Sequence, residues 1–106
     1  MTLDTVFDLA SLTKVVATTP SVMRLVEEGR LRLNDPVASY IPEFARQGKQ
    51  TITIRHVLTH VSGLGADLDL ETEWVGYERA MARAADERPL AKPGEQFVYS
   101  DINFLV

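Results

Sequence analysis

The chain has 106 residues and a formal net charge of −4; 45% of its residues are hydrophobic and 25% are charged. These values are typical of one globular domain, and we expect a single domain over residues 1–106. The basic residues are scattered, which disfavours a nucleic-acid partner, and no apolar run approaches the roughly 20 residues of a membrane span. Cys is absent, and the N-terminal residues lack the pattern of a signal peptide, so the compartment stays undecided.

The first expected element is a helix that starts near Ser11. Apolar side chains recur from Leu12 to Val26 at the three- and four-residue spacing of one helix face. Pro20 interrupts this stretch and removes one backbone hydrogen bond. Because the apolar phase continues across Pro20, we expect one kinked helix rather than two. Gly29 supplies the stop, since glycine readily adopts the left-handed conformation of a helix end.

The middle of the chain predicts two short helices. A helical turn is expected over residues 37–40, ended by Pro42. The residues around Thr53 alternate like a strand, but Thr53 also suits the N-cap of a helix over residues 54–59. We favour the helix and expect it to end at residues 62–63, where serine precedes glycine.

The last third of the chain predicts one longer helix and a short final one. Trp74, Tyr77 and Met81 mark one face of a helix over residues 71–86, and we interpret them as core rather than as a ligand cage. Residues 97–99 are expected to be extended, directly before a last helix. The predicted fold class is therefore mostly α, with little strand.

The motif that carries chemistry is Ser11-Leu12-Thr13-Lys14. Residues three apart share a helix face, so a helix starting here would hold the Ser11 hydroxyl beside the Lys14 amine. A serine nucleophile with a lysine partner requires that arrangement. The alternative is an N-capping serine followed by a solvated lysine, because such strings also arise by chance.

Three further segments follow this motif along the chain. Together the four segments resemble the serine β-lactamase and penicillin-binding-protein family, above all its class C branch of esterases and D-peptidases. The resemblance runs across essentially the whole chain but covers only part of the family's usual domain. The four segments are FDLASLTK at 7–14, LVEEGRLRLNDPV at 25–37, TIRHVLTHVSGL at 53–64 and PGEQFVYSD at 93–101.

The resemblance implies roles for three residues. Ser11 corresponds to the acylated nucleophile, Lys14 to its partner base, and Tyr99 to the tyrosine of the family's Tyr-x-Asn element. A lysine acts as a base only when neutral, and lowering its pKa from about 10.4 to about 7 takes roughly 4–5 kcal/mol. Tyr99 would share protons with Lys14, so either group could be the acylation base, and the pair should titrate as a unit.

Asp101 departs from the family pattern, which most often has asparagine there. A carboxylate near Lys14 would hold the lysine charged, which favours Tyr99 over Lys14 as the acylation base. Alternatively, Asp101 only caps the helix that follows it. Asp101 is therefore a supporting site residue in one reading and a structural one in the other.

The family's third element, a downstream Lys-Thr-Gly or His-x-Gly strand that completes the oxyanion hole, has no counterpart in this chain. Lys92-Pro93-Gly94 precedes Tyr99, and proline lacks the N–H that the role requires. The chain thus corresponds to the helical part of the family's two-part α/β fold. We expect negligible turnover from the chain alone and an exposed apolar face that favours self-association or a complementing remainder of the domain.

Two functions from different classes follow. The first is a serine hydrolase that forms an acyl-enzyme on a small-molecule ester, amide or β-lactam; the alternative is a non-catalytic helical binding or self-association module. The resemblance implies no cofactor. His56 and His60 have a zinc-compatible spacing, but no glutamate or third ligand accompanies them, so we expect no metal site and a hydrogen-bonding role for His60.

Overall fold

The computed structural model describes residues 1–68 and 76–106. Over these residues the chain is helical, and the only strand-type pairing is an isolated antiparallel bridge between Pro36 and Thr53. The predicted mostly-α fold class is confirmed for this part of the chain. In chain order the elements are η1 (Ala10–Leu12), η2 (Lys14–Thr18), α1 (Thr19–Glu27), η3 (Val37–Ser39), η4 (Pro42–Gly48), α2 (Ile54–Leu58), α3 (Tyr77–Asp86) and α4 (Ile102–Leu105).

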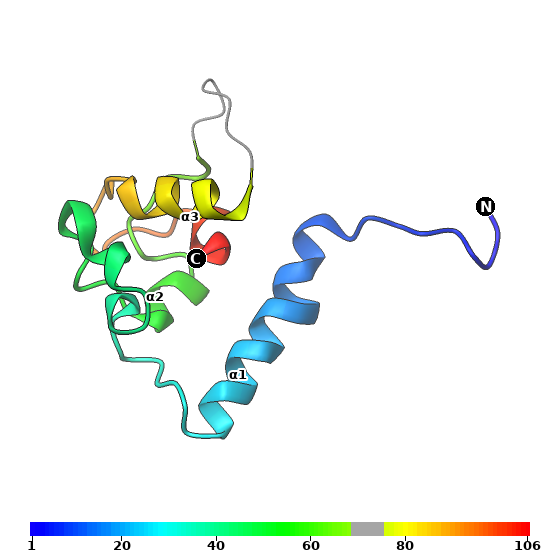
Figure 1. Cartoon of the computed structure of the whole chain (residues 1–106), viewed down its shortest axis with the longest axis horizontal. Helices are drawn as coiled ribbons and strands as arrows, with labels where there is room; N and C mark the ends of the chain where they lie inside the picture. The colour runs from blue at the N-terminus through cyan, green and yellow to red at the C-terminus, as the bar shows by residue number, and fades with distance from the viewer. Residues whose placement is uncertain (69–75) are drawn as a thin grey trace.

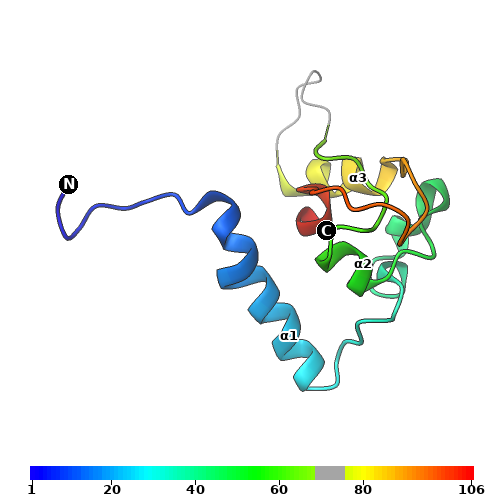
Figure 2. The same ribbon diagram turned by 180° about the vertical axis from the view of Figure 1, so that it is seen from behind.

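The elements form an arm and a body (Figure 1). The helical arm, residues 10–27, consists of η1, η2 and α1, and the residues before it run away from the molecule. The body, residues 37–68 and 76–106, packs the remaining helices around one core. Seen from behind, in Figure 2, the arm again lies to one side of the body. One face of the arm contacts the body, because Val22 packs against the core and Lys14 forms an ion pair with Asp101.

The arm runs through Pro20 as one helix, as the apolar phase predicts, but its turns are irregular (Figure 1). η1 is a 3₁₀ turn and η2 is a π-helix, in which the Thr19 N–H donates to the Lys14 carbonyl five residues earlier. The widened turn directly precedes Pro20, which lacks an N–H and lies in the first turn of α1. Proline therefore explains where the helix departs from α geometry.

Gly29 ends the arm as expected. Its φ is 73°, in the left-handed region. The Arg30 N–H donates to the Leu25 carbonyl at 2.9 Å and the Gly29 N–H to the Val26 carbonyl at 3.0 Å. These two bonds define a Schellman motif, which satisfies carbonyls at the helix end.

The start of α2 confirms the helix interpretation of the Thr53 region. The Thr53 hydroxyl accepts the His56 N–H at 3.2 Å, and His56 Nδ1 accepts the Thr53 N–H at 3.1 Å. This reciprocal capping box satisfies two backbone donors that the first turn of a helix leaves unpaired.

The expected end of α2 at residues 62–63 is wrong, because the helix ends at Leu58. The left-handed residue that ends it is His60, with φ 58°. The Val61 N–H donates to the His56 carbonyl at 3.0 Å and the His60 N–H to the Val57 carbonyl at 3.4 Å, again a Schellman motif. The sequence did not indicate this helix end, because the left-handed position that glycine usually occupies is held by a histidine.

The helical turn expected over residues 37–40 is present as η3 and ends before Pro42. The sequence did not predict that Pro42 also begins the 3₁₀ helix η4, where proline at a first helical position loses no hydrogen bond. Tyr77 is not a core residue, because it is 78% exposed at the start of α3, while Met81 is half-buried. Trp74 lies outside the described residues.

The core of the body includes a buried lysine that the sequence pattern did not indicate. Lys49 is fully buried, and its Nζ donates to the carbonyls of Ala84 and Ala85 at 2.7 and 2.6 Å, at the end of α3. Nζ also lies 4.6 Å from the ring centroid of Phe44. Burial lowers the pKa of Lys49 to about 8. The apolar core comprises Val37, Phe44, Ile52, Ile54, Val57, Leu64, Leu68, Ala84 and Ile102.

The arm and the residues before it leave apolar side chains uncovered, as expected. Val15 and Val16 are 64% and 62% exposed. None of the described helices has the length and apolar character needed to cross a membrane. The other exposed apolar side chains of this region include Val6, Phe7, Leu9, Leu12 and Met23.

Candidate active site

Ser11 lies in the 3₁₀ turn η1, at the end of the arm. The preceding Ala10 has φ 46°, a conformation that non-glycine residues rarely adopt, and its N–H donates to Asp8 Oδ1 at 2.8 Å. Lys14 Nζ reaches Ser11 Oγ at 3.3 Å. The tightened turn therefore brings together the hydroxyl and the amine that the motif predicts to be neighbours.

Lys14 forms an ion pair with Asp101. Nζ lies 2.6 Å from Asp101 Oδ1, and the Lys14 side chain is only 13% exposed. The hydrogen bond to Asp101, followed by that to Tyr99, raises the pKa of Lys14 above its ordinary value. Lys14 is therefore cationic at neutral pH.

The ion pair decides between the two interpretations of Asp101. Asp101 occupies the N-cap position of α4, but its side chain makes no capping hydrogen bond there. Its carboxylate instead reaches back to Lys14 in the arm. Asp101 thus belongs to the candidate site and does not merely cap α4.

Tyr99 completes the cluster from the loop before α4. Hydrogen bonding to the Ser11 side chain first, and to Lys14 second, lowers the pKa of the Tyr99 phenol. Lys14 Nζ lies 5.0 Å from the Tyr99 ring centroid. The structure thus gathers all four sequence-predicted residues, with the nucleophile candidate in the arm and the tyrosine in the body.

One neighbour of the cluster was not anticipated. The ring of Phe104, on α4, lies 5.7 Å from Lys14 Nζ and gives the ammonium a second aromatic face. Phe104 is three residues after Asp101, on the same side of a helix, and this spacing is the signal that could have identified it.

The two histidines serve different parts of the molecule. His56 Nδ1 belongs to the cap of α2, whereas His60 Nδ1 accepts the Ser100 N–H at 3.1 Å. Each ring therefore already uses one nitrogen as an acceptor for a backbone donor. Among residues 1–68 and 76–106, no three His, Cys, Asp or Glu side chains are grouped so that they could hold a metal ion.

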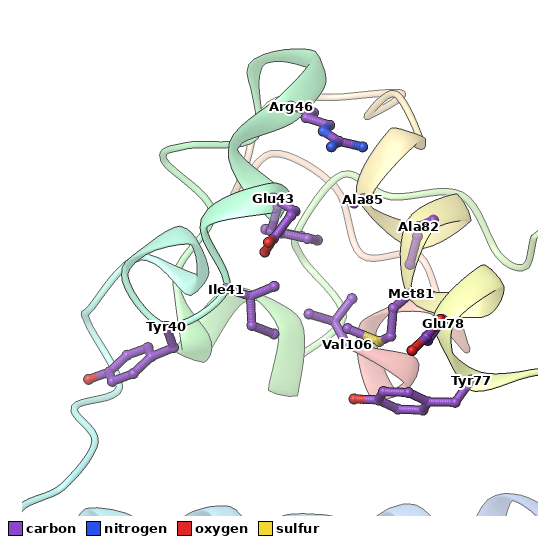
Figure 3. A pocket seen from close by; sticks show the side chains of 12 residues that line it. Tyr40, Ile41, Glu43, Arg46, Tyr77, Glu78, Met81, Ala82, Ala85 and Val106 are labelled. Atoms are coloured by element: carbon purple, nitrogen blue, oxygen red, sulfur yellow. The ribbon is translucent and has the colours of Figure 1, made fainter.

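A cavity of about 410 Å³ lies elsewhere, between η4 and α3. In Figure 3 the side chains of Ile41, Met81 and Val106 face one another across it. Its lining is mainly apolar and includes none of the four clustered residues. Convergent polar groups mark reactive sites better than apolar space does, so we assign the candidate site to the Ser11 cluster.

Comparison with known proteins places this geometry in context. A family model described as Beta-lactamase matches residues 1–106. Putative D-alanyl-D-alanine carboxypeptidases of Salmonella agona and Salmonella paratyphi B are each 32% identical over 118 residues, which cover 99% of this chain and 27% of the relative. The chain thus spans about a quarter of the length of these curated relatives.

Solved structures agree with the sequence match. A penicillin-binding protein homologue from Caulobacter crescentus superposes with a TM-score of 0.76 at 36% identity, over 89% of this chain and 26% of that one. EstA from Arthrobacter nitroguajacolicus superposes with a TM-score of 0.70 at 35% identity, over 90% and 27% of the two chains. The predicted correspondence to the helical part of such folds is thereby confirmed.

Proposed function

Because the chain belongs to the beta-lactamase family, we propose that it provides the nucleophile and base of a serine hydrolase that works through an acyl-enzyme at Ser11. The observation that carries this proposal is the cluster of Ser11, Lys14, Tyr99 and Asp101, which joins the arm to the loop before α4. Residues 1–106 are, in this proposal, a partial β-lactamase-like domain.

The opposite pKa shifts of Lys14 and Tyr99 favour Tyr99 as the acylation base. The Tyr99 phenol loses its proton before the Lys14 ammonium does, because hydrogen bonds lower the first pKa and raise the second. A phenolate beside a retained ammonium can accept the Ser11 proton while the positive charge stabilises it. Lys14 then acts electrostatically, held in place by Asp101.

The proposed reaction has two displacements. Tyr99 takes the hydroxyl proton as Ser11 Oγ bonds to the carbonyl carbon of an ester, amide or β-lactam. The tetrahedral intermediate expels its leaving group, which receives the proton from Tyr99, and leaves an acyl-Ser11 ester. The Tyr99 phenolate then takes a proton from water as the water oxygen attacks the ester carbon. The new tetrahedral intermediate breaks its bond to Ser11 Oγ, which receives that proton back from Tyr99, and the carboxylic acid product leaves.

The oxyanion hole limits what the chain can do by itself. The Ser11 backbone N–H can supply one donor, and the resemblance implies a second donor from a strand that has no counterpart among the described residues. Losing one such donor typically reduces the rate by about 10²–10³. We therefore expect Ser11 to be acylated slowly and turnover to be negligible.

The substrate class follows from the relatives only as a proposal. The Salmonella relatives are named putative D-alanyl-D-alanine carboxypeptidases, and another structural neighbour is titled EstCE1, a hydrolase with promiscuous acyltransferase activity. We favour an ester or a peptide over a β-lactam as the substrate. A binding or self-association module is the second candidate, supported by exposed apolar residues such as Val15 and Val16.

A covalent probe tests the nucleophile. A fluorophosphonate should label the wild-type chain and not Ser11→Ala. Ser21→Ala is the matched control, because the Ser21 hydroxyl lies on the same arm and donates to the Ala17 carbonyl. Equal labelling of wild type and Ser11→Ala would exclude Ser11 as the nucleophile. Burst kinetics with a chromogenic ester, with and without a complementing C-terminal fragment, then separate a split enzyme from a module.

A further inference from the structure

His60 holds a left-handed backbone conformation that is uncommon among non-glycine residues. Its φ of 58° and that of Gly29, 73°, occur at the equivalent position of two Schellman motifs, at the ends of α2 and α1. Glycine is the usual residue there because it has no Cβ to clash in the left-handed region. Strain of this kind persists where the side chain is needed, so the contacts of His60 merit a functional explanation.

Those contacts surround Tyr99. The Val98 N–H donates to the His60 carbonyl at 2.9 Å, and the Ser100 N–H donates to His60 Nδ1 at 3.1 Å. The Tyr99 ring lies over the His60 ring, with centroids 4.5 Å apart and planes inclined by 33°. Both neighbours of Tyr99 in the sequence, and its own ring, are thus held by His60.

This arrangement requires a neutral imidazole. Nδ1 accepts the Ser100 N–H only while it carries no proton, and Nε2 then carries the ring hydrogen. Burial is the main cause that lowers the pKa of His60, and the charge of Lys14 adds to it. At neutral pH the ring is therefore unprotonated.

The groups that face His60 come from three sides. Lys14 in the arm opposes its protonation, whereas Asp101 in the loop favours it. Tyr99 stacks on one side, and α4 contributes Phe104, with ring centroids 5.2 Å apart, and Asn103, whose amide lies 3.3 Å from Nδ1. Phe104 and Asn103 do not titrate, so the titratable groups around the His60 ring are Lys14, Tyr99 and Asp101.

We propose that His60 is a positioning residue for Tyr99, which it holds against Ser11 while its ring is neutral and releases when the ring is protonated. This inference rests on the proposed function of Ser11 and Tyr99. Protonation would place an Nδ1 hydrogen against the Ser100 N–H, so one hydrogen bond becomes a repulsive contact between two donors.

Two substitutions of His60 distinguish the effect of losing the hydrogen-bond acceptor Nδ1 from the effect of relieving the backbone strain. His60→Gly relieves the left-handed backbone but removes the acceptor and the ring, and circular dichroism should show that its helix content matches that of wild type. His60→Asn tolerates the same backbone and offers an amide oxygen near the position of Nδ1, without a titratable group. His56→Asn, in the cap of α2, is the matched histidine control outside the cluster.

Ser11 labelling gives the first readout. At pH 8 we expect His60→Gly to be labelled about tenfold more slowly than wild type, the size expected from losing one net hydrogen bond. His60→Asn should stay within about threefold, and His56→Asn should match wild type. Below the pKa of His60, the wild-type rate should fall more steeply with pH than that of His60→Asn. If His60→Gly were labelled at the same rate as wild type, the proposal would be overturned.

The Ser100 amide resonance gives a readout independent of reactivity. In wild type and His56→Asn it should shift with the titration of His60, and in His60→Asn this shift should be absent. If wild-type Ser11 is not labelled at all, the proposed function fails while this measurement still decides the contact. If the chemical shift of the Ser100 amide in wild type did not change as His60 titrates, the positioning role itself would be overturned.

Discussion

At the scale of single residues, Asp101 determines the charge state of the candidate site. Its carboxylate lies 2.6 Å from Lys14 Nζ and is the main reason that the pKa of Lys14 is raised. It also raises the pKa of Tyr99 slightly, against the larger lowering by Ser11 and Lys14. The aspartate therefore stabilises the ammonium while weakening the stabilisation that the ammonium gives to a phenolate.

Asp101→Asn should shift the acid limb of Ser11 labelling to lower pH. Without the carboxylate, the unneutralised Lys14 ammonium lowers the pKa of Tyr99 further. The measurement is a pH–rate profile of labelling, with phenolate absorbance in a Tyr40→Phe, Tyr77→Phe background to assign the limb to Tyr99. Asp86→Asn, which breaks an ion pair with Arg46 in the body, is the matched control. An unchanged profile would exclude coupling between Asp101 and the base.

Lys49 should give the stability an alkaline dependence. Its folded pKa of about 8 lies below the ordinary value of 10.5, so the unfolded chain binds the proton more tightly. Stability therefore rises as the pH increases from about 8 to about 10.5, by up to roughly 3 kcal/mol. Urea denaturation across this range measures the slope, and Lys49→Met should remove the part due to this residue. Parallel curves for wild type and Lys49→Met would contradict the prediction.

At the scale of elements, the sequence predicted helix ends where the residue type itself forms the end. Thr53 identified the start of α2 because its hydroxyl caps the first turn, and Gly29 identified the end of the arm. The end of α2 was missed because His60 takes the left-handed position without a glycine. η4 was missed because a proline can mark either the end of one helix or the first turn of the next.

In the candidate site, the sequence predicts the contacts between neighbouring residues but not the contacts that depend on the tertiary fold. Ser11 and Lys14 are one turn apart, so their proximity follows from helix geometry. The meeting of Lys14 with Asp101 is a tertiary contact, which no local pattern can predict. The π turn of η2 likewise depends on how Pro20 is accommodated, and the burial of Lys49 depends on the packing of α3 over η4.

Thr53→Ala should destabilise the body by about 1 kcal/mol, the typical effect of removing an N-cap side chain. The substitution leaves the His56 N–H without its acceptor and breaks the capping box. Chemical denaturation monitored by far-UV circular dichroism measures the loss. Thr51→Ala, at an exposed threonine two residues earlier, is the matched control and should leave stability within about 0.5 kcal/mol of wild type. Equal midpoints for both variants would argue against a capping role.

At the scale of the whole molecule, the arm and the body differ in how well their apolar surface is covered. The body encloses a core that includes Phe44, Ile52 and Ile102, each at most 1% exposed, whereas Val15 and Val16 in the arm are more than 60% exposed. The chain spans 27% of the length of the Salmonella relatives. If it is a partial domain, as proposed above, the uncovered face of the arm is the surface on which the rest of the domain packs. Apolar surface of this extent favours association.

The wild-type chain should therefore self-associate as its concentration rises, and Val16→Lys should weaken the association by placing a charge on the exposed apolar face. Ser21→Lys is the matched control, because it adds the same charge at an exposed polar position of the same arm. Sedimentation velocity over a concentration series measures the effect. A wild-type chain that stays monomeric throughout would contradict the prediction.

The ion pair between Lys14 and Asp101 also has a kinetic consequence. The two residues are 87 positions apart in the sequence, so their contact closes a loop that contains most of the chain. Closing a loop of this length carries an entropy cost that local contacts do not have, so we expect this ion pair to form after local helices such as α2. The contact of Lys14 with Ser11 is local, whereas the contacts of the arm with Asp101 and Tyr99 require the arm and the body to be in place together.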